Sequence, residues 1–310
     1  MLIGTVSGLT SALIWSASSL AVKAQAARID TLSFNTFRQF VGGLFFLALL
    51  PFFGGFAQLF AFSAPAALAL AISVILGIGV GDSIYFWSLT KIGASRAMPL
   101  SGVYPLFTWA LAVPILGERI TLAAIIGTGL ILIALYLISR EASAETNDYI
   151  ITMDDVSELS TRNNEQQNTL RLGVIAAIFA AFTWACSTTL LRLTLSADTN
   201  ALAINAFRLV VGGVVLLPVV HFFKGGGAWR GYNRAALPAL IVLGVLSTGV
   251  GSLLWVWSVQ FAGAARAALF NTISPLMGVP LSVIFLRERV TWRVGLGSVM
   301  AVAGVWLILL

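Results

Sequence analysis

The stretch NTFRQFVGG at Asn35–Gly43 occurs again 170 residues further along the chain, as NAFRLVVGG at Asn205–Gly213. The same offset pairs Gly79–Gly81 with Gly249–Gly251, Trp87–Ser88 with Trp257–Ser258, Gly93–Ala97 with Gly263–Ala267, and Glu118–Thr121 with Glu288–Thr291. Nearer the start of each copy the offset is 169, which pairs Trp15 with Trp184. A duplicated, apolar chain is typical of transporters that are built from two structural repeats.

The composition is that of a membrane protein. Hydrophobic residues make up 59% of the chain and charged residues 10%, whereas soluble domains average roughly 45–50% and 25%. The apolar residues form blocks long enough to cross a bilayer as helices, which takes roughly 20 residues each. No series of short segments with alternating hydrophobicity, as a membrane β-barrel requires, is visible. The predicted fold class is therefore an all-α, polytopic membrane protein. We predict ten transmembrane helices: Leu2–Val22, Thr31–Phe53, Pro65–Leu89, Gly93–Leu116, Thr121–Ser139, Leu172–Leu193, Ala201–Phe223, Ala235–Val259, Gly263–Leu286 and Thr291–Leu309.

One polar segment separates the two copies. Arg140–Thr169 holds seven of the twelve acidic residues and many Asn, Gln, Ser and Thr, a composition typical of a solvated and largely disordered linker. We therefore expect a first five-helix repeat at residues 1–139, a linker at 140–170 and a second five-helix repeat at 171–310. Because five is odd, the second repeat enters the membrane from the opposite side. The repeats are predicted to be inverted copies, related by a pseudo-two-fold axis in the membrane plane.

Other sequence features exclude several classes of function. The net charge is +6, but Lys and Arg stand singly at the ends of apolar segments, where they reach lipid headgroups rather than nucleic acid. The single cysteine, Cys186, lies within a predicted span and leaves no disulfide framework and no cysteine-based metal site. No Walker-type GxxxxGK[ST] segment is present, so this chain does not use ATP. We expect no cofactor and no metal, and a monomer or homodimer in the plasma membrane.

Three motifs resemble a known family. They are the paired Trp15 and Trp184, the Asn-x-Phe-Arg of each second span, and the Gly-Glu-Arg-Ile-Thr at Gly117–Thr121. In order and spacing they are similar to the EamA repeat of the drug/metabolite transporter superfamily, over both halves of the chain. The resemblance implies ten helices in two inverted repeats, a central substrate cavity and alternating access. It further implies export of amino acids, other metabolites or toxic compounds, often coupled to protons. It also implies cytoplasmic termini, whereas the positions of Lys and Arg place both termini outside by the positive-inside rule.

Asp82 is the only acidic residue in the interior of a predicted span. Tyr85 lies one helical turn further on the same face, and Ser252 and Trp255 occupy the corresponding positions of the second half. A charge at the centre of a membrane costs roughly 2.5–3.5 kcal/mol on insertion scales, so intramembrane acids are functional by default. Asp82 can carry a coupling proton, neutralise a cationic substrate, or hold helices together by pairing with Arg38. The sequence leaves these three roles open.

Arg38 and Arg208 occupy the same position in the two copies, inside the second span of each half. An arginine offers a carboxylate two parallel N–H donors, which makes anion binding one interpretation. The presence of the residue in both copies favours the other interpretation, a structural role such as holding a helix end.

Polar and aromatic side chains at helical spacing mark the remaining candidates. They recur on corresponding faces of both halves, which favours a shared polar cavity, whereas a single stripe would indicate helix–helix hydrogen bonds. Prolines interrupt the predicted fourth and ninth spans, and broken helices there can present backbone groups to a substrate. The candidate substrate and proton residues are Asp82, Tyr85, Trp15, Tyr104, Ser101, Trp184, Ser252, Trp255 and Asn271.

The sequence favours a secondary active transporter that exports small metabolites, amino acids or drug-like compounds, with a small-molecule substrate, the lipid bilayer and coupling protons as its partners. The alternative is a passive channel or facilitator, although the rings of charges or carbonyls that form a selectivity filter are not apparent. An intramembrane enzyme is a third hypothesis, for which one His and one buried acid are a poor basis. We therefore do not expect an enzyme, and the sequence does not identify the substrate.

Overall fold

The structure is a computed structural model of the 310-residue chain. It describes residues 1–25, 29–93, 97, 100–118, 121–147, 156–229, 232, 234, 236–271, 273, 292, 296–297, 299–300, 303–304 and 307. Every regular element in these ranges is helical, and none of the described residues forms a strand, so the all-α class is confirmed. Five described helical stretches are long and apolar enough to span a membrane: Leu2–Val22, Ala64–Ile92, Asn168–Leu193, Ala201–Trp229 and Leu237–Ala262. Shorter apolar helices occupy Tyr104–Leu116 and Leu122–Ala134, and the number of ten spans stays a prediction.

The two repeats begin with the same succession of helices, up to the end of the third span. The first is formed by α1 (Leu2–Gln25), α2 (Thr31–Leu49), a rod made of α3 (Ala64–Val74), η3 (Ile75–Asp82) and α4 (Ser83–Ile92), then α6 (Tyr104–Leu116) and α7 (Leu122–Asn147). The second is formed by α8 (Val156–Leu193), α9 (Ala201–Lys224), a rod made of α10 (Leu237–Gly244), η5 (Val245–Val250) and α11 (Gly251–Ala262), then α12 (Ala264–Asn271). The predicted tenth span and the later half of the ninth lie outside the described residues, apart from isolated positions.

Equivalent residues start equivalent helices. The carboxylate of Asp30 accepts hydrogen bonds from two backbone N–H groups in the first turn of α2, and the side-chain oxygen of Asn200 does the same for α9. Both residues belong to the set that caps free N–H groups at a helix N-terminus. The start of each second helix is therefore encoded locally, in the same way in both copies.

The repeated stretches that open the sequence pack against each other, because α2 and α9 lie side by side. A Cβ atom at Gly42 would lie 2.9 Å from Cδ1 of Leu209, and one at Gly212 would collide with the side chain of Gln39. Gln39 and Leu209 are themselves counterparts at the 170-residue offset. Such reciprocal contacts, in which residue i meets j and the copy of i meets the copy of j, are what two-fold symmetry produces.

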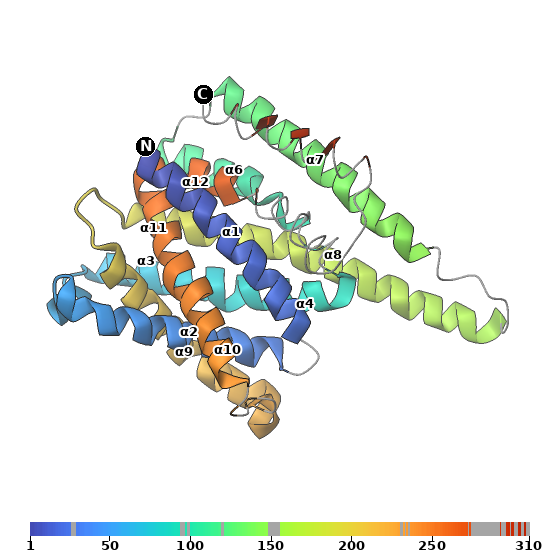
Figure 1. The fold of residues 1–310 in the computed structure, drawn as a ribbon, viewed down its shortest axis with the longest axis horizontal. Helices are drawn as coiled ribbons and strands as arrows, with labels where there is room; N and C mark the ends of the chain where they lie inside the picture. Colours follow the sequence, from blue (N-terminus) through green and yellow to red (C-terminus); the bar gives the residue numbers. More distant parts are fainter. Residues whose placement is uncertain are drawn as a thin grey trace.

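The first helix of each repeat packs against the third span of the other repeat. α1 runs along α11 (Figure 1), and α8 lies along α3, η3 and α4. Side-chain hydroxyls fasten both contacts: Ser11 donates to the carbonyl of Gly251 at 3.0 Å, and Ser187 donates to the carbonyl of Ser73 at 2.6 Å. The repeats are thus interlocked rather than separate domains, and the orientation of their symmetry axis in the membrane stays a prediction.

A further contact between the repeats explains the Gly-Glu-Arg motif. Glu118, which follows α6, accepts hydrogen bonds from the backbone N–H groups of Ala264 at 2.8 Å and Ala265 at 2.9 Å. A carboxylate at this position satisfies free N–H groups and interacts favourably with the N-terminal end of the α12 dipole. The first repeat therefore caps a helix of the second.

Both third spans contain a π-helical segment at the same place. η3 begins at Ile75 and η5 at Val245, which are 170 residues apart. π-helical turns are rare and occur frequently at functional sites, because they shift the regular hydrogen bonds and re-aim the following side chains. Asp82 is the last residue of η3, so this local feature sets the direction of the candidate acid.

Helical backbone extends into the predicted linker from both sides, because α7 continues to Asn147 and α8 begins at Val156 (Figure 1). A helix that an apolar span has already nucleated extends at little cost. This helical backbone differs from the largely disordered segment expected from composition, while the division into domains stays a prediction.

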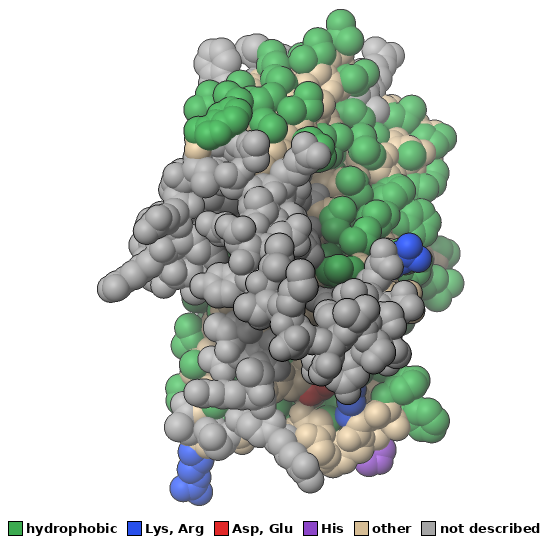
Figure 2. All heavy atoms as spheres, turned by 90° about the vertical axis from the view of Figure 1, so that its right-hand side faces the viewer, with side chains coloured by type: hydrophobic (Ala, Val, Ile, Leu, Met, Phe, Trp, Pro, Cys, Tyr) green, Lys and Arg blue, Asp and Glu red, His purple; other side chains and the backbone are tan. Residues whose placement is uncertain are grey.

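The outer surface suits a lipid environment. On the face shown in Figure 2, hydrophobic side chains cover much of the part that is described. Large hydrophobic side chains such as Leu122 and Phe222 are exposed. A soluble monomer rarely exposes apolar patches of this extent. The chain is a multi-pass membrane protein.

Candidate functional site

A cavity of about 130 Å³ lies between the repeats. An engineered cavity of roughly 150 Å³ holds a benzene molecule, so the space suits a small organic molecule. All the candidate residues line it: Trp15, Arg38, Asp82, Tyr85, Ser101, Tyr104, Trp184, Arg208, Ser252, Trp255 and Asn271. The lining also includes Ser18, Ser19, Gly77, Ile78, Phe86, Gly102, Ser187, Thr188 and Thr248, which were not among the candidates. Helical spacing could have predicted some of them, since Ser19 and Thr188 lie one helical turn after the candidates Trp15 and Trp184.

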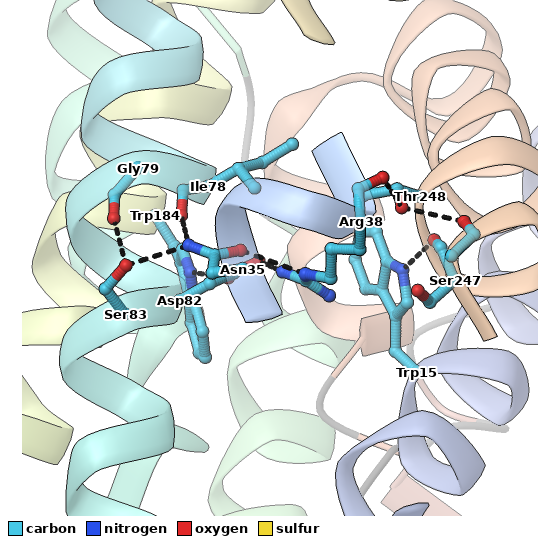
Figure 3. Close-up of polar contacts among 11 residues, drawn as sticks. Trp15, Asn35, Arg38, Ile78, Gly79, Asp82, Ser83, Trp184, Ser247 and Thr248 are labelled. Carbon is cyan, nitrogen blue, oxygen red and sulfur yellow. Dashed lines mark hydrogen bonds and ion pairs between the residues drawn. The ribbon is translucent and has the colours of Figure 1, made fainter. Parts of the chain in front are cut away.

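An ion pair between Arg38 on α2 and Asp82 at the end of η3 lies at the cavity (Figure 3). The Arg38 side chain is 5% exposed and the Asp82 side chain 20%. The second carboxylate oxygen of Asp82 accepts a hydrogen bond from Nε1 of Trp184, at 2.8 Å. Asp82 is therefore held by one residue from each repeat, and its pairing with Arg38 is the contact that the third sequence interpretation requires.

Asn35 positions Arg38 for this ion pair. The two residues are three positions apart and share a face of α2; Nε of Arg38 donates to Oδ1 of Asn35 at 2.9 Å. The amide nitrogen of Asn35 donates in turn to the carbonyl of Ile78 at 2.6 Å and to the hydroxyl of Ser83 at 2.8 Å (Figure 3). The Asn-x-x-Arg of the first copy thus fastens α2 to the π-helical segment that carries Asp82.

The same motif in the second copy is not fastened in this way. The amide nitrogen of Asn205 donates only within α9, to the carbonyl of Ala201 at 2.9 Å. Among the described residues, Oδ1 of Asn205 and Nε of Arg208 have no hydrogen-bond partner, although both residues are buried. At the position of Asp82 the second copy has Ser252, which offers no charge.

Aromatic rings from both repeats form a continuous wall of the cavity. The ring centroids of Trp15 and Trp255 are 5.5 Å apart, those of Trp255 and Tyr104 6.3 Å, those of Tyr104 and Trp184 6.2 Å, and those of Trp184 and Tyr85 5.1 Å. These distances are within the range at which aromatic pairs attract each other. The indole N–H of Trp15 donates to the carbonyl of Ser247 at 2.9 Å, which fixes one end of the wall.

The predicted interruption of the fourth span places Tyr104. Gly102 and Val103 form a turn, and α6 begins immediately after it, with Pro105 at a position where a helix tolerates proline. The hydroxyl groups of Tyr104 and Thr188 lie 2.6 Å apart and form a hydrogen bond. Pro114 lies inside α6, while Pro99, Pro275 and Pro280 lie outside the described residues.

The chemistry of the site is that of binding. In the described lining, two arginines and one aspartate are charged, and aromatic rings and hydroxyl groups supply most of the remainder. Within the described ranges, no group of three or more His, Cys, Asp or Glu is arranged to hold a metal ion. The arrangement can enclose a small molecule, stack against its apolar part and interact with a charged group.

The sequence profile of the EamA-like transporter family matches residues 2–140 and 171–310, which is both repeats without the linker. The chain belongs to the EamA-like transporter family. It is therefore a transporter by family, and the resemblance expected from the three sequence motifs is confirmed.

Individual EamA-like relatives agree with this assignment. An uncharacterized transporter of Archaeoglobus fulgidus is 25% identical over 97% of this chain and 96% of its own length. A probable terminal-alkyne amino-acid exporter of Streptantibioticus cattleyicolor is 28% identical over 44% of each chain. A crystal structure of another protein superposes with a TM-score of 0.71 at 17% identity, over 98% of this chain and 95% of that one. At this identity the crystal structure shows the shared fold alone.

Proposed function

We propose that this protein is a secondary active transporter that exports a small metabolite, such as an amino acid, by alternating access coupled to protons through Asp82. The observation that carries the proposal is the cavity between two interlocked, two-fold-related repeats, with the Arg38–Asp82 ion pair in its lining. The expectation that the nine substrate and proton candidates bind substrate or protons, and that Arg38 and Arg208 are structural or anion-binding, forms part of this proposal.

The relation between the repeats supports alternating access. If two copies of one structure adopt slightly different conformations, exchanging those conformations yields a second state of similar energy that faces the other side. The reciprocal contacts of α2 with α9, and of each first helix with the opposite third span, are compatible with such an exchange.

The ion pair supports proton coupling. A proton that binds the Asp82 carboxylate removes the negative charge that holds Arg38 and accepts from Trp184. Breaking a buried ion pair at one partner costs about 3–5 kcal/mol, enough to favour a different arrangement of α2, η3 and α8. Protonation is thereby linked to the conformation of both repeats.

Export of amino acids or related metabolites is supported by the Streptantibioticus cattleyicolor relative, whose name describes an amino-acid exporter. The cavity volume of about 130 Å³ and its aromatic wall also suit a molecule of that size. Large drug-like compounds fit this volume less well.

Counterflow in proteoliposomes tests the proposal. Vesicles with the purified protein are loaded with a mixture of the twenty amino acids, and isotope-labelled amino acids are added outside, with and without an imposed pH gradient. We expect labelled molecules to enter faster when unlabelled ones are inside, and to accumulate when the pH gradient is present. Flux without stimulation from the opposite side would instead indicate a channel or facilitator.

A further inference from the structure

The two buried arginines of the cavity differ in what surrounds them. Arg38 is 4% exposed and Arg208 3%, both line the cavity, and they are counterparts in α2 and α9. Arg38 has a carboxylate partner, Asp82, and a side-chain acceptor, Asn35. No carboxylate of a described residue pairs with Arg208, and its Nε atom has no acceptor among those residues.

Among the described residues that line the cavity, the one carboxylate is that of Asp82, which is already paired with Arg38. Asp82 is the only acid in the interior of a predicted span, and it pairs with Arg38. The charged residues among the described lining are thus two arginines and one aspartate, which together carry one positive charge in excess. An unpaired buried charge is strongly unfavourable, and in a membrane such a group generally belongs to a binding site.

From this imbalance we infer that Arg208 binds the carboxylate of the transported molecule, and that the substrate is a small monocarboxylate with an apolar or aromatic remainder. A guanidinium donates two parallel hydrogen bonds to a carboxylate, a stronger and more directional contact than a lysine makes. One excess positive charge matches one carboxylate. Trp15, Trp255 and Tyr104 supply the surface on which the remainder of the molecule packs.

Other polar atoms at the site suit the same ligand. Asn271 also lines the cavity, and the N–H groups of its side-chain amide can donate to a carboxylate oxygen. Ser252, the counterpart of Asp82, lines the same cavity as Arg208 and carries no charge. The second copy of the motif thus keeps the arginine and lacks the residue that would neutralise it.

This inference rests on the proposed function, because it assigns the cavity to the transported molecule, but it is tested by binding alone. The probes are benzoate and benzamide, which share shape and ring and differ in charge. Their dissociation constants are measured with purified protein in detergent, by quenching of tryptophan fluorescence. We expect benzoate to bind the wild type about tenfold or more tightly than benzamide, since a hydrogen bond to a charged group contributes at least that factor.

Arg208→Gln keeps a polar side chain and removes the charge, and we expect it to abolish the preference for benzoate. Arg171→Gln is the matched control, because Arg171 is exposed on α8, and it keeps the preference. Equal binding of the two probes by the wild type, no binding of benzoate, or an unchanged preference in Arg208→Gln would each overturn the inference. Benzoate binding without counterflow in vesicles would overturn the proposed function, while the assignment of Arg208 to carboxylate binding would still hold.

A second measurement separates binding from a structural role. If the role of Arg208 is to bind a ligand, Arg208→Gln removes an unpaired buried charge. Without ligand, the variant then has a melting temperature equal to that of the wild type or higher. If Arg208 holds the helices together, the melting temperature falls. A lowered melting temperature together with an unchanged benzoate preference would assign Arg208 to the fold.

Discussion

The α2 side and the α9 side of the cavity have the same scaffold and different charges. Asn35 and Arg38 recur as Asn205 and Arg208, on helices that begin with equivalent caps and pack on each other reciprocally. On the α2 side Asp82 neutralises the arginine, whereas on the α9 side no described residue does so. The comparison teaches that the repeated sequence places an arginine on both sides of the cavity. The difference between Asp82 and Ser252 at corresponding positions gives the two arginines different proposed roles. One arginine holds the proposed proton carrier, and the other is left for the ligand.

Removing the acid of the α2 side gives the largest expected effect. Asp82→Asn keeps size and some hydrogen bonding but cannot change charge, so we expect transport driven by a pH gradient to be abolished while downhill exchange continues. Proteoliposome flux with and without the gradient measures both. Asp198→Asn, at an exposed position, is the control and keeps both activities.

Other outcomes of the Asp82→Asn experiment identify the remaining roles. Wild-type uphill transport by a well-folded variant eliminates coupling through Asp82. A parallel loss of exchange and uphill flux indicates that Asp82 neutralises a cationic substrate. A loss of stability that Arg38→Gln partly restores indicates a purely structural ion pair, because the second change removes the orphaned charge.

Giving the α9 side its own acid tests the difference directly. Ser252→Asp places a carboxylate at the position that corresponds to Asp82, where it can neutralise Arg208. We expect the preference for benzoate over benzamide to fall by about tenfold, because the new carboxylate competes with the ligand for the same donors. Fluorescence titration measures it, and a retained preference would mean that position 252 does not face Arg208.

The two first-span tryptophans offer a smaller contrast. The indole of Trp184 donates to the charged Asp82, whereas that of Trp15 donates to the neutral carbonyl of Ser247. Replacing each by Phe removes the donor and keeps a ring. We expect Trp184→Phe to cost about 1.5–3 kcal/mol of stability and Trp15→Phe about 0.5–1.5 kcal/mol, as for hydrogen bonds to charged and neutral groups. Denaturant titration in detergent measures the two losses of unfolding free energy. A larger loss in Trp15→Phe than in Trp184→Phe would contradict a charged Asp82.

Glu118→Gln tests the helix cap that crosses between the repeats. The amide has one acceptor oxygen where the carboxylate uses two, so we expect a loss of about 0.5–2 kcal/mol, typical of a removed cap. Glu288→Gln changes the counterpart in the second copy. A loss of similar size in both variants would mean that the contact is duplicated, and no loss in Glu118→Gln would exclude its role as a cap.

The smallest effect is expected from a deletion in the segment that connects the two repeats. Deleting most of residues 141–168, while leaving enough chain to connect the halves, is expected to preserve insertion and transport, because a solvated polar segment contributes little packing. Membrane expression and flux are the measurements. Normal expression without transport would give this segment a functional role.

What the sequence could reveal depended on whether a feature is local or repeated. The duplication, the helical class and the candidate residues follow from spacing and composition, which is why Trp15, Tyr104 and Asn271 were found. The contacts among Asn35, Arg38 and Asp82 depend on how α2 faces η3, and a pattern within single helices does not contain that information. For the same reason the recurrence of arginine favoured one structural role for both copies, although their surroundings differ.

The reciprocal glycines of α2 and α9 have a consequence for how the two gene halves change over time. Gly43 faces Val210 while Gly213 faces Phe40, so each copy of the motif is the packing surface for the other. A larger residue in one copy would require a smaller one in the other, and the two halves cannot drift independently here. Positions 82 and 252 border empty space instead, where an acid and a serine are both accommodated. We therefore expect the two halves to keep similar residues where α2 packs against α9. Residues that line the cavity are free to differ, and such differences can change which substrate the protein binds.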